Sequence, residues 1–148
     1  MAVRDTKQKP FIEDRDDNIF IGIDLPFRKS DGKEGYFAST TTTIEAVKNN
    51  IKNLLKTTKG ERLLQPNLGL NLKKYLFEQF TDDLKDKIAE DILETFKFWL
   101  PFVNVTNIEI NMDDSDDNVG KNKMNIIVHF NIIKDPNTLE SVLIEIGD

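Results

Sequence analysis

The sequence predicts an α+β fold, a two-layer single domain in which three helices pack on a small, mostly antiparallel sheet. Between residues 42 and 100 apolar side chains recur with the period of a helix that has one buried face. At residues 19–24, and again after residue 102, apolar and polar side chains alternate, as they do in strands. A block of helices between strands favours helices gathered on one face of an antiparallel sheet. The length of 148 residues fits one such domain.

Residues 1–18 are expected to form a flexible N-terminal arm that precedes the domain at 19–148. The arm is polar and mixed in charge, and the run at 13–17 (Glu-Asp-Arg-Asp-Asp) has no apolar side chain to bury. Two interpretations remain open: the arm is a disordered tail, or it becomes ordered on a neighbouring subunit.

The domain is predicted to begin with a short strand. Ile19, Ile21 and Ile23 alternate with other residues, so they share one face of a strand at 19–24. Pro26 ends this strand, and the glycines and polar residues at 28–35 predict an exposed loop.

The first helix is predicted to begin near Thr42, because Thr42 and Glu45 have the spacing of a capping box. Gly60 lies where a helix commonly finishes in a left-handed residue. The apolar stripe consists of Ile44, Val47, Ile51, Leu54 and Leu55. A basic ridge on the other side consists of Lys48, Lys52, Lys56, Lys59 and Arg62. The ridge either faces an acidic partner or is a solvated face with cations near the helix C-terminus.

Two further helices are predicted before the sheet. Leu72, Tyr75 and Leu76 have helical spacing, and Thr81 or Asp82 is expected to cap a longer helix that Pro101 stops. The apolar stripe of that helix consists of Leu84, Ile88, Ile92, Phe96, Trp99 and Leu100. The acidic face opposite consists of Asp82, Asp86, Glu90 and Glu94, and we expect it to be solvated.

Three strands are predicted in the C-terminal part of the chain, at 103–112, 123–133 and 141–146. The alternation changes phase within the first of them, which indicates a bulge near Thr106. Met124, Ile126, Val128, Phe130 and Ile132 give the second strand one apolar face. An acidic loop is expected at 113–122, and the run 135–137 (Asp-Pro-Asn) predicts the turn before the last strand.

Composition excludes several classes of function. A formal net charge of −6 argues against a general nucleic-acid binder. The absence of cysteine excludes disulfides and thiolate chemistry. No apolar run resembles a signal peptide or a membrane span, so we expect a soluble protein that is made in a cytoplasm and binds no membrane.

No motif indicates a metal, a cofactor or a nucleophile. His129 is the sole histidine and is predicted to be a surface residue of a strand. The acidic run that begins at Asp113 suggests calcium, yet Asn118 and Met124 occupy the positions where an EF-hand loop requires glycine and glutamate. Gly60 and Gly69 are not spaced as in a phosphate-binding loop. We therefore expect no cofactor.

The most specific pattern in the chain links the end of the first helix to the second helix. It reads Leu-Leu-x-Thr-x-x-Gly-Glu-Arg, then Pro, then Gly, then Leu-Phe-Glu, and its residues are Leu54, Leu55, Thr57, Gly60, Glu61, Arg62, Pro66, Gly69, Leu76, Phe77 and Glu78. This pattern resembles the small baseplate wedge subunit of contractile-tailed phages, a family also called lysozyme-like. A related subunit occurs in type VI secretion baseplates.

The resemblance implies a structural component of a phage tail baseplate wedge, not an enzyme. Such a subunit binds the other wedge proteins, occurs in multiple copies of a symmetric assembly, and provides a platform for assembly of the contractile tail sheath. It would be assembled in the host cytoplasm and reside in the virion tail baseplate. The alternatives are a type VI secretion or tailocin baseplate subunit, which differs in genomic context, and a peptidoglycan hydrolase, which differs in activity.

The resemblance implies a set of residues that bind partners or hold the motif in shape. They are Gly60, Glu61, Arg62, Pro66, Gly69, Leu76, Phe77, Glu78 and Pro101. A glycosidase needs two carboxylates beside a cleft, and Glu61 and Glu78 are the two in this motif. Because Arg62 lies beside Glu61, we favour an ionic role in which the two residues close the turn. Arg62 would also bridge to Glu78. The chain departs from the family at 100–102, where Leu-Pro-Phe replaces Glu-Pro-Arg.

The last strand is expected to have an exposed edge. Contractile sheaths are joined by strands donated between subunits, and the resemblance implies a similar edge here. Glu140, Glu145 and Asp148 place charge near this strand, which discourages pairing with itself. We therefore expect an outer strand within 123–146 to accept an extended segment of the sheath. The alternative is that the N-terminal arm covers the edge at 141–146.

Overall fold

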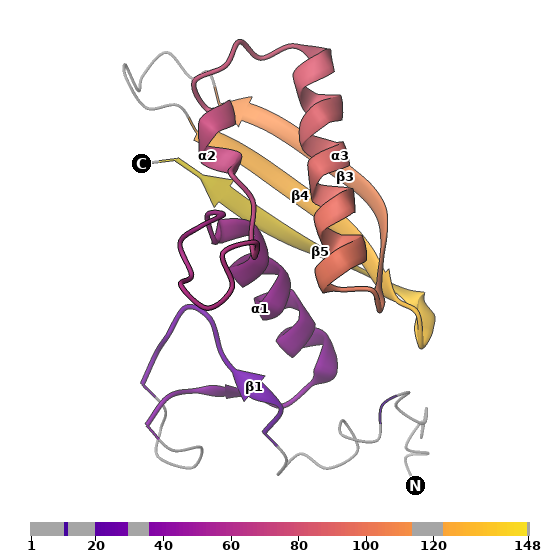
Figure 1. The fold of residues 1–148 in the computed structure, drawn as a ribbon. Helices are drawn as coiled ribbons and strands as arrows, with labels where there is room; N and C mark the ends of the chain where they lie inside the picture. Colours follow the sequence, from indigo (N-terminus) through magenta and orange to yellow (C-terminus); the bar gives the residue numbers. More distant parts are fainter. Residues whose placement is uncertain (1–10, 12–19, 30–35, 114–122, 148) are drawn as a thin grey trace, which may run out of the picture. The chain divides into compact units, whose positions relative to one another are not determined.

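The computed structural model describes residues 11, 20–29, 36–113 and 123–147 (Figure 1). These residues form three helices and two antiparallel sheets, of two and three strands. The predicted α+β class is confirmed. The chain divides into two compact units, residues 1–50 and 51–148. No helix within the described residues is long and apolar enough to cross a membrane.

The first unit contains a small hairpin. Strand β1 (Gly22–Ile23) pairs antiparallel with β2 (Ser39–Thr40), and an isolated bridge joins Lys29 to Phe37. Within the predicted strand at 19–24, the structure therefore has a strand at Gly22–Ile23. Phe11 is buried. The rest of the predicted arm at 1–18, and residues 30–35 of the predicted loop, lie outside the described residues.

Helix α1 (Thr43–Lys56) begins and ends close to the predicted residues. The hydroxyl oxygen of Thr42 accepts a hydrogen bond from the backbone N–H of Glu45 at 3.3 Å, which satisfies one of the free donors of the first turn. The stripe residues Val47, Ile51, Leu54 and Leu55 are buried. The cap at Thr42 and the apolar face are therefore confirmed.

Two helices follow in the second unit. Helix α2 (Leu72–Tyr75) is a single turn, and α3 (Asp82–Trp99) is the long amphipathic helix. Thr81 is the N-cap of α3, and its hydroxyl oxygen accepts from the N–H of Leu84 at 3.3 Å. As predicted, α3 buries Leu84, Ile88, Ile92 and Phe96. The acidic face is exposed and consists of Asp82, Asp86, Glu90 and Glu94.

The three-stranded sheet has the order β3-β4-β5 and is antiparallel throughout. Its strands are β3 (Val103–Asp113), β4 (Lys123–Ile132) and β5 (Asp135–Ile146). The register shifts between Val105 and Asn107, so the bulge predicted near Thr106 is confirmed. The acidic loop considered for calcium lies outside the described residues, apart from its flanks.

The turn predicted at 135–137 is wrong. The chain turns at residues 133–134, and β5 already begins at Asp135, which is the register partner of Ile132. A proline within a strand normally removes a hydrogen bond of the sheet. β5 lies at the edge of the sheet, where the missing N–H of Pro136 can be tolerated. The side-chain amide of Asn131 also donates to the carbonyl of Pro136 at 3.2 Å, which ties this part of β5 to β4.

The sheet has one buried and one open face. Ile126, Val128, Phe130 and Ile144 are fully buried, and α3 lies along the sheet in this unit (Figure 1). The opposite face carries His129, whose Nε2 atom lies 3.1 Å from Oε1 of Glu109, and Leu143, which is half exposed. This alternation matches the predicted phase of the second strand and places His129 away from the core.

Candidate partner-binding site

The motif residues form a closed loop between α1 and α2, which we call the motif loop and define as residues 57–71 (Figure 1). The backbone N–H of Gly60 donates to the carbonyl of Pro66 at 2.8 Å, across the base of the turn. Within the turn, the N–H of Gln65 donates to the carbonyl of Arg62 at 3.2 Å. Both interactions are backbone hydrogen bonds, so the shape of the loop depends little on its exposed side chains.

Two glycines are required by the backbone of the motif loop, for different reasons. Gly60 has a φ of +91°, and a Cβ added there would meet nothing within 4 Å, so its requirement is conformational. Gly69 has a φ of +100°, and a Cβ there would lie 2.1 Å from the carbonyl oxygen of Thr57. The close approach exists because the N–H of Leu70 donates to that same oxygen at 2.9 Å. The end of the loop is thereby fastened to its beginning.

Glu61 and Arg62 both contact the end of α1. One carboxylate oxygen of Glu61 accepts from the backbone N–H of Thr58 at 3.0 Å. The guanidinium of Arg62 donates to the side-chain oxygen of Asn53 at 3.1 Å. Glu61 therefore helps to close the turn, as expected.

The expected bridge from Arg62 to Glu78 is not formed within the described part of the chain. Both side chains are exposed, and the guanidinium of Arg62 is directed to Asn53 instead. The sequence pattern misplaced this interaction because Asn53 is nine positions away in a preceding helix, and only the fold of the loop brings it near.

The remaining motif residues do not form one cluster. Leu76 is buried in the core, whereas Phe77 is 83% exposed and Glu78 is also exposed. Pro101 is exposed directly after α3, where Leu100 still donates to the carbonyl of Phe96 at 2.8 Å. The motif therefore has a structural part, in the loop and at Leu76, and an exposed part that can contact another molecule.

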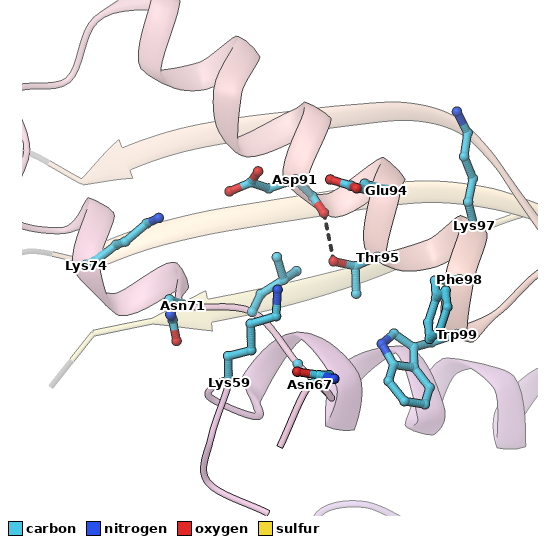
Figure 2. A pocket seen from close by; sticks show the side chains of 12 residues that line it. Lys59, Asn67, Asn71, Lys74, Asp91, Glu94, Thr95, Lys97, Phe98 and Trp99 are labelled. Carbon is cyan, nitrogen blue, oxygen red and sulfur yellow. Dashed lines mark hydrogen bonds between the residues drawn. The ribbon is translucent and has the colours of Figure 1, made fainter. Parts of the chain in front are cut away.

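An open pocket of about 500 Å³ lies between the motif loop, α2 and α3 (Figure 2). Figure 2 shows Lys59, Asn67 and Asn71 on the side of the loop and residues of α3 across from them. Lysines and carboxylates line it together with apolar and aromatic side chains, so its wall is mixed in charge and partly apolar. The lining residues are Lys59, Asn67, Gly69, Leu70, Asn71, Lys74, Asp91, Glu94, Thr95, Lys97, Phe98 and Trp99.

A hydrogen bond from Tyr75 to Asp91 joins α2 to α3 beside this pocket. The phenol of Tyr75 is buried and donates to Oδ2 of Asp91 at 2.5 Å. Burial raises the pKa of Tyr75 above its usual value, and the hydrogen bond to Asp91 and the negative charge of Asp91 raise it further. The Nζ atom of Lys74 lies 4.4 Å from the centre of the Tyr75 ring. Of these contacts, the hydrogen bond to Asp91 ties α2 to α3.

The pocket has two carboxylates in its wall. Asp91 and Glu94 are its carboxylates, and Asp91 is already engaged by Tyr75. Glu61 and Glu78, the pair expected for a hydrolase, do not line it. Among the described residues, no group of histidine, aspartate or glutamate side chains could hold a metal ion.

Sequence reasoning did not identify the pocket or the two leucines at the tip of the motif loop. Leu63 and Leu64 are each 98% exposed. A signal for the leucines was present, because they lie between Gly60 and Pro66 and belong to neither helical stripe. No local signal predicts the pocket, since its residues come from segments that meet only in the folded protein.

Comparison with known proteins gives a family. Residues 41–137, more than half of the chain, match the family model described as Baseplate wedge protein gp25. None of the curated protein sequences matches this chain.

Solved structures resemble this chain at low sequence identity. A Geobacter sulfurreducens protein with the provisional name of a tail lysozyme has a TM-score of 0.56 and 17% identity, and the match covers 71% of this chain and 90% of that one. A chain of the anti-feeding prophage baseplate has a TM-score of 0.55 and 20% identity, covering 83% of this chain and 81% of that one. These two share the fold. A chain of a type VI secretion baseplate complex has a TM-score of 0.48 and 12% identity, covering 70% of this chain and 92% of that one.

Proposed function

Because this chain belongs to the baseplate wedge protein gp25 family, we propose that it is a structural, non-enzymatic subunit of a contractile-tail baseplate. It binds other wedge proteins and provides a platform on which the tail sheath assembles. It is present in several copies of a symmetric assembly, which forms in the host cytoplasm.

The observation that carries this proposal is the motif loop. Its backbone is closed by the hydrogen bonds from Gly60 to Pro66 and from Leu70 to Thr57, yet residues 61–67 are all exposed. A loop that is ordered by its own backbone, and that buries none of those side chains, is suited to contact another protein with little further loss of entropy. Phe77 adds an exposed aromatic side chain beside α2.

The edge of β5 supports the sheath-binding part of the proposal. Within the described residues, β5 pairs with β4 on one side and with no strand on the other. An unpaired edge presents backbone donors and acceptors that an extended segment can complete. We propose that residues 141–146 of β5 accept a strand from the sheath protein.

Purified tails or tail-like particles are used to test whether this chain is part of a baseplate. The expected result is that mass spectrometry finds this chain in the baseplate fraction and not in the tube or sheath fraction. The genes next to this one then distinguish a phage or tailocin from a type VI secretion system. Absence of the chain from complete baseplates would reject the structural role.

The edge of β5 is tested by a proline at an exposed position. Ile144 is fully buried, so proline there would damage the core; Leu143 is 53% exposed and is the better site. Leu143→Pro is expected to block sheath polymerisation on baseplates, whereas Leu143→Ser, which keeps the backbone N–H, is expected to permit it. Circular dichroism and the unfolding midpoint establish that Leu143→Pro is folded. Normal sheaths on baseplates that contain folded Leu143→Pro would show that this edge is not used.

A further inference from the structure

Leu63 and Leu64 are the most exposed large apolar side chains among the described residues, each at 98%. They are adjacent, and they occupy the tip of the motif loop between Arg62 and Gln65. Single exposed leucines are common on protein surfaces. Two neighbouring leucines that contact almost nothing of their own domain are a stronger sign of an interaction site.

The loop holds these leucines away from the domain. The N–H of Gln65 donates to the carbonyl of Arg62 at 3.2 Å, which closes a turn directly around the two leucines. Outside this turn, the hydrogen bond from Gly60 to Pro66 closes a second ring, and the hydrogen bond from Leu70 to Thr57 closes the base. The leucines therefore cannot fold back on the core without breaking backbone hydrogen bonds.

We propose that Leu63 and Leu64 insert into an apolar recess, bordered by carboxylates, on a different protein of the baseplate. The inference rests on the proposed function and makes it specific. The motif residues Gly60, Pro66 and Gly69 shape the loop, and the two leucines make the contact.

The charges around the tip determine which partner fits. Lys59 and Arg62 precede the leucines in sequence, and Lys56 lies one turn along α1 from Asn53, the partner of Arg62. Glu61 is the single carboxylate between them, and it accepts a hydrogen bond from the N–H of Thr58, so the cations outnumber it. These cations are complementary to carboxylates at the border of a recess.

A second copy of this chain is a poor partner for the same reason. Two tips that meet would bring both sets of cations together, and like charges placed face to face disfavour that arrangement. The pocket of another copy has both lysines and carboxylates in its wall, so it does not offer a purely acidic border.

A lipid surface is also a poor partner. The side chains of two leucines contain fewer carbon atoms than one myristoyl chain, which by itself gives only marginal membrane binding.

The first test measures incorporation into particles. Leu63→Ser/Leu64→Ser is produced together with the wild-type chain, and the ratio of the two in purified baseplates is measured by mass spectrometry. The double variant is expected to be depleted at least about tenfold, because buried anchor residues contribute most of the affinity of an interface. Leu93→Ser/Leu139→Ser removes two other exposed leucines and is expected to be incorporated like the wild type. Equal incorporation of both double variants would overturn the proposal.

The second test identifies what the tip touches. Leu64 is replaced by the photo-crosslinking amino acid p-benzoylphenylalanine, and assembled particles are irradiated. The expected product joins this chain to a different baseplate polypeptide, at apolar residues with aspartate or glutamate nearby in sequence or structure. Crosslinks confined to a second copy of this chain, or no crosslink in complete particles, would overturn the proposal. So would binding of the purified chain to vesicles of phosphatidylcholine and phosphatidylglycerol that is lost in Leu63→Ser/Leu64→Ser.

These outcomes test the structural function and the role of the leucines separately. Absence of the wild-type chain from particles rejects the structural function itself. Presence of the wild type together with equal incorporation of Leu63→Ser/Leu64→Ser rejects only the role of the leucines. Unfolding midpoints of both double variants, compared with the wild type, show whether depletion reflects binding or folding.

Discussion

Gly69 is the residue of the motif loop that tolerates a side chain least. Its φ of +100° disfavours any L-amino acid, and a Cβ would lie 2.1 Å from the backbone oxygen of Thr57, which cannot swing aside as a side chain can. At Gly60 the backbone is also left-handed, with φ at +91°, but the space around it is open. The same substitution should therefore have different costs at the two positions.

We predict that Gly69→Ala lowers the free energy of unfolding by at least about 3 kcal/mol, whereas Gly60→Ala lowers it by about 1 kcal/mol. The difference arises because Gly69→Ala must break or lengthen the hydrogen bond from Leu70 to Thr57. Urea unfolding of both variants measures the two costs. Equal losses would show that the loop moves freely at Gly69 and is not fastened as described.

A second prediction at this scale concerns Arg62. A buried ionic role would make its removal costly, but the guanidinium is exposed and donates to the neutral side-chain oxygen of Asn53. We expect Arg62→Ala to lower the free energy of unfolding by less than about 1 kcal/mol, which is typical of one exposed hydrogen bond. Thermal unfolding checks this value, with Asn53→Ala as the matched partner variant. A loss as large as that of Gly69→Ala would indicate a further partner of Arg62.

At the scale of elements, the contact between α2 and α3 depends on Tyr75. α2 has a single turn, too short to be stable alone, and the phenol of Tyr75 fixes it to Asp91 of α3. The raised pKa of Tyr75 means that its proton is held more tightly in the folded than in the unfolded chain. Above pH about 10, where an ordinary tyrosine ionises, the unfolded chain releases this proton and the folded chain retains it. Stability must then fall as pH rises.

We therefore predict that the free energy of unfolding of the wild type falls as the pH rises above about 10. Part of this fall comes from Tyr75 and is expected to be absent in Tyr75→Phe. At neutral pH, Tyr75→Phe is expected to cost about 1–2 kcal/mol, because Asp91 loses its donor. Urea unfolding at several pH values compares the two proteins, and Tyr36→Phe, at an exposed tyrosine, is the control. Identical slopes for wild type and Tyr75→Phe above this pH would contradict the assignment.

The sequence predicts those elements whose causes are local. The caps at Thr42 and Thr81 and the bulge at Thr106 each follow from a few neighbouring residues, and all three occur in the structure. The start of β5 could not be predicted, because Asp135, Pro136 and Asn137 are typical turn residues. Their strand conformation depends on the edge position of β5.

The candidate site was predicted only in part, for the same reason. The glycines of the motif loop follow from helix-ending and turn chemistry, and the structure confirms the left-handed φ at Gly60. The contact of Arg62 with Asn53 and the pocket between the loop and α3 join residues that belong to different elements. Such contacts follow from the packing of elements and leave no periodic signal in the sequence.

At the scale of the whole molecule, charge is unevenly distributed. The formal net charge is −6, and α3 exposes a row of acidic residues, yet the motif loop and the neighbouring turns of α1 and α2 carry Lys56, Lys59, Arg62, Lys73 and Lys74. A basic patch on an otherwise acidic chain can be oriented by the field of an acidic partner. The proposed docking of the leucine tip agrees with this distribution of charge.

The Geobacter sulfurreducens protein of similar fold has the provisional name of a tail lysozyme. Peptidoglycan cleavage is therefore the alternative function that most needs a test. A glycosidase requires two carboxylates facing one bond, with one of them able to donate a proton. Glu61 is exposed and accepts from the N–H of Thr58, and Glu78 does not line the pocket. In the pocket, Asp91 accepts the hydrogen bond of Tyr75, so Glu94 is the one remaining carboxylate among the residues that line it.

We predict that the purified chain does not clear suspensions of cell walls at acidic, neutral or mildly alkaline pH. Turbidity is followed with a known muramidase as the positive control. Clearing by the wild type that persisted in Asp91→Asn and Glu94→Gln would indicate a contaminating enzyme. Clearing that either variant abolished would show that the pocket is catalytic, because each substitution removes a carboxylate while keeping nearly the same shape. A baseplate subunit that also cut the cell wall would need such a site, and the engagement of Asp91 by Tyr75 is the structural reason to expect none.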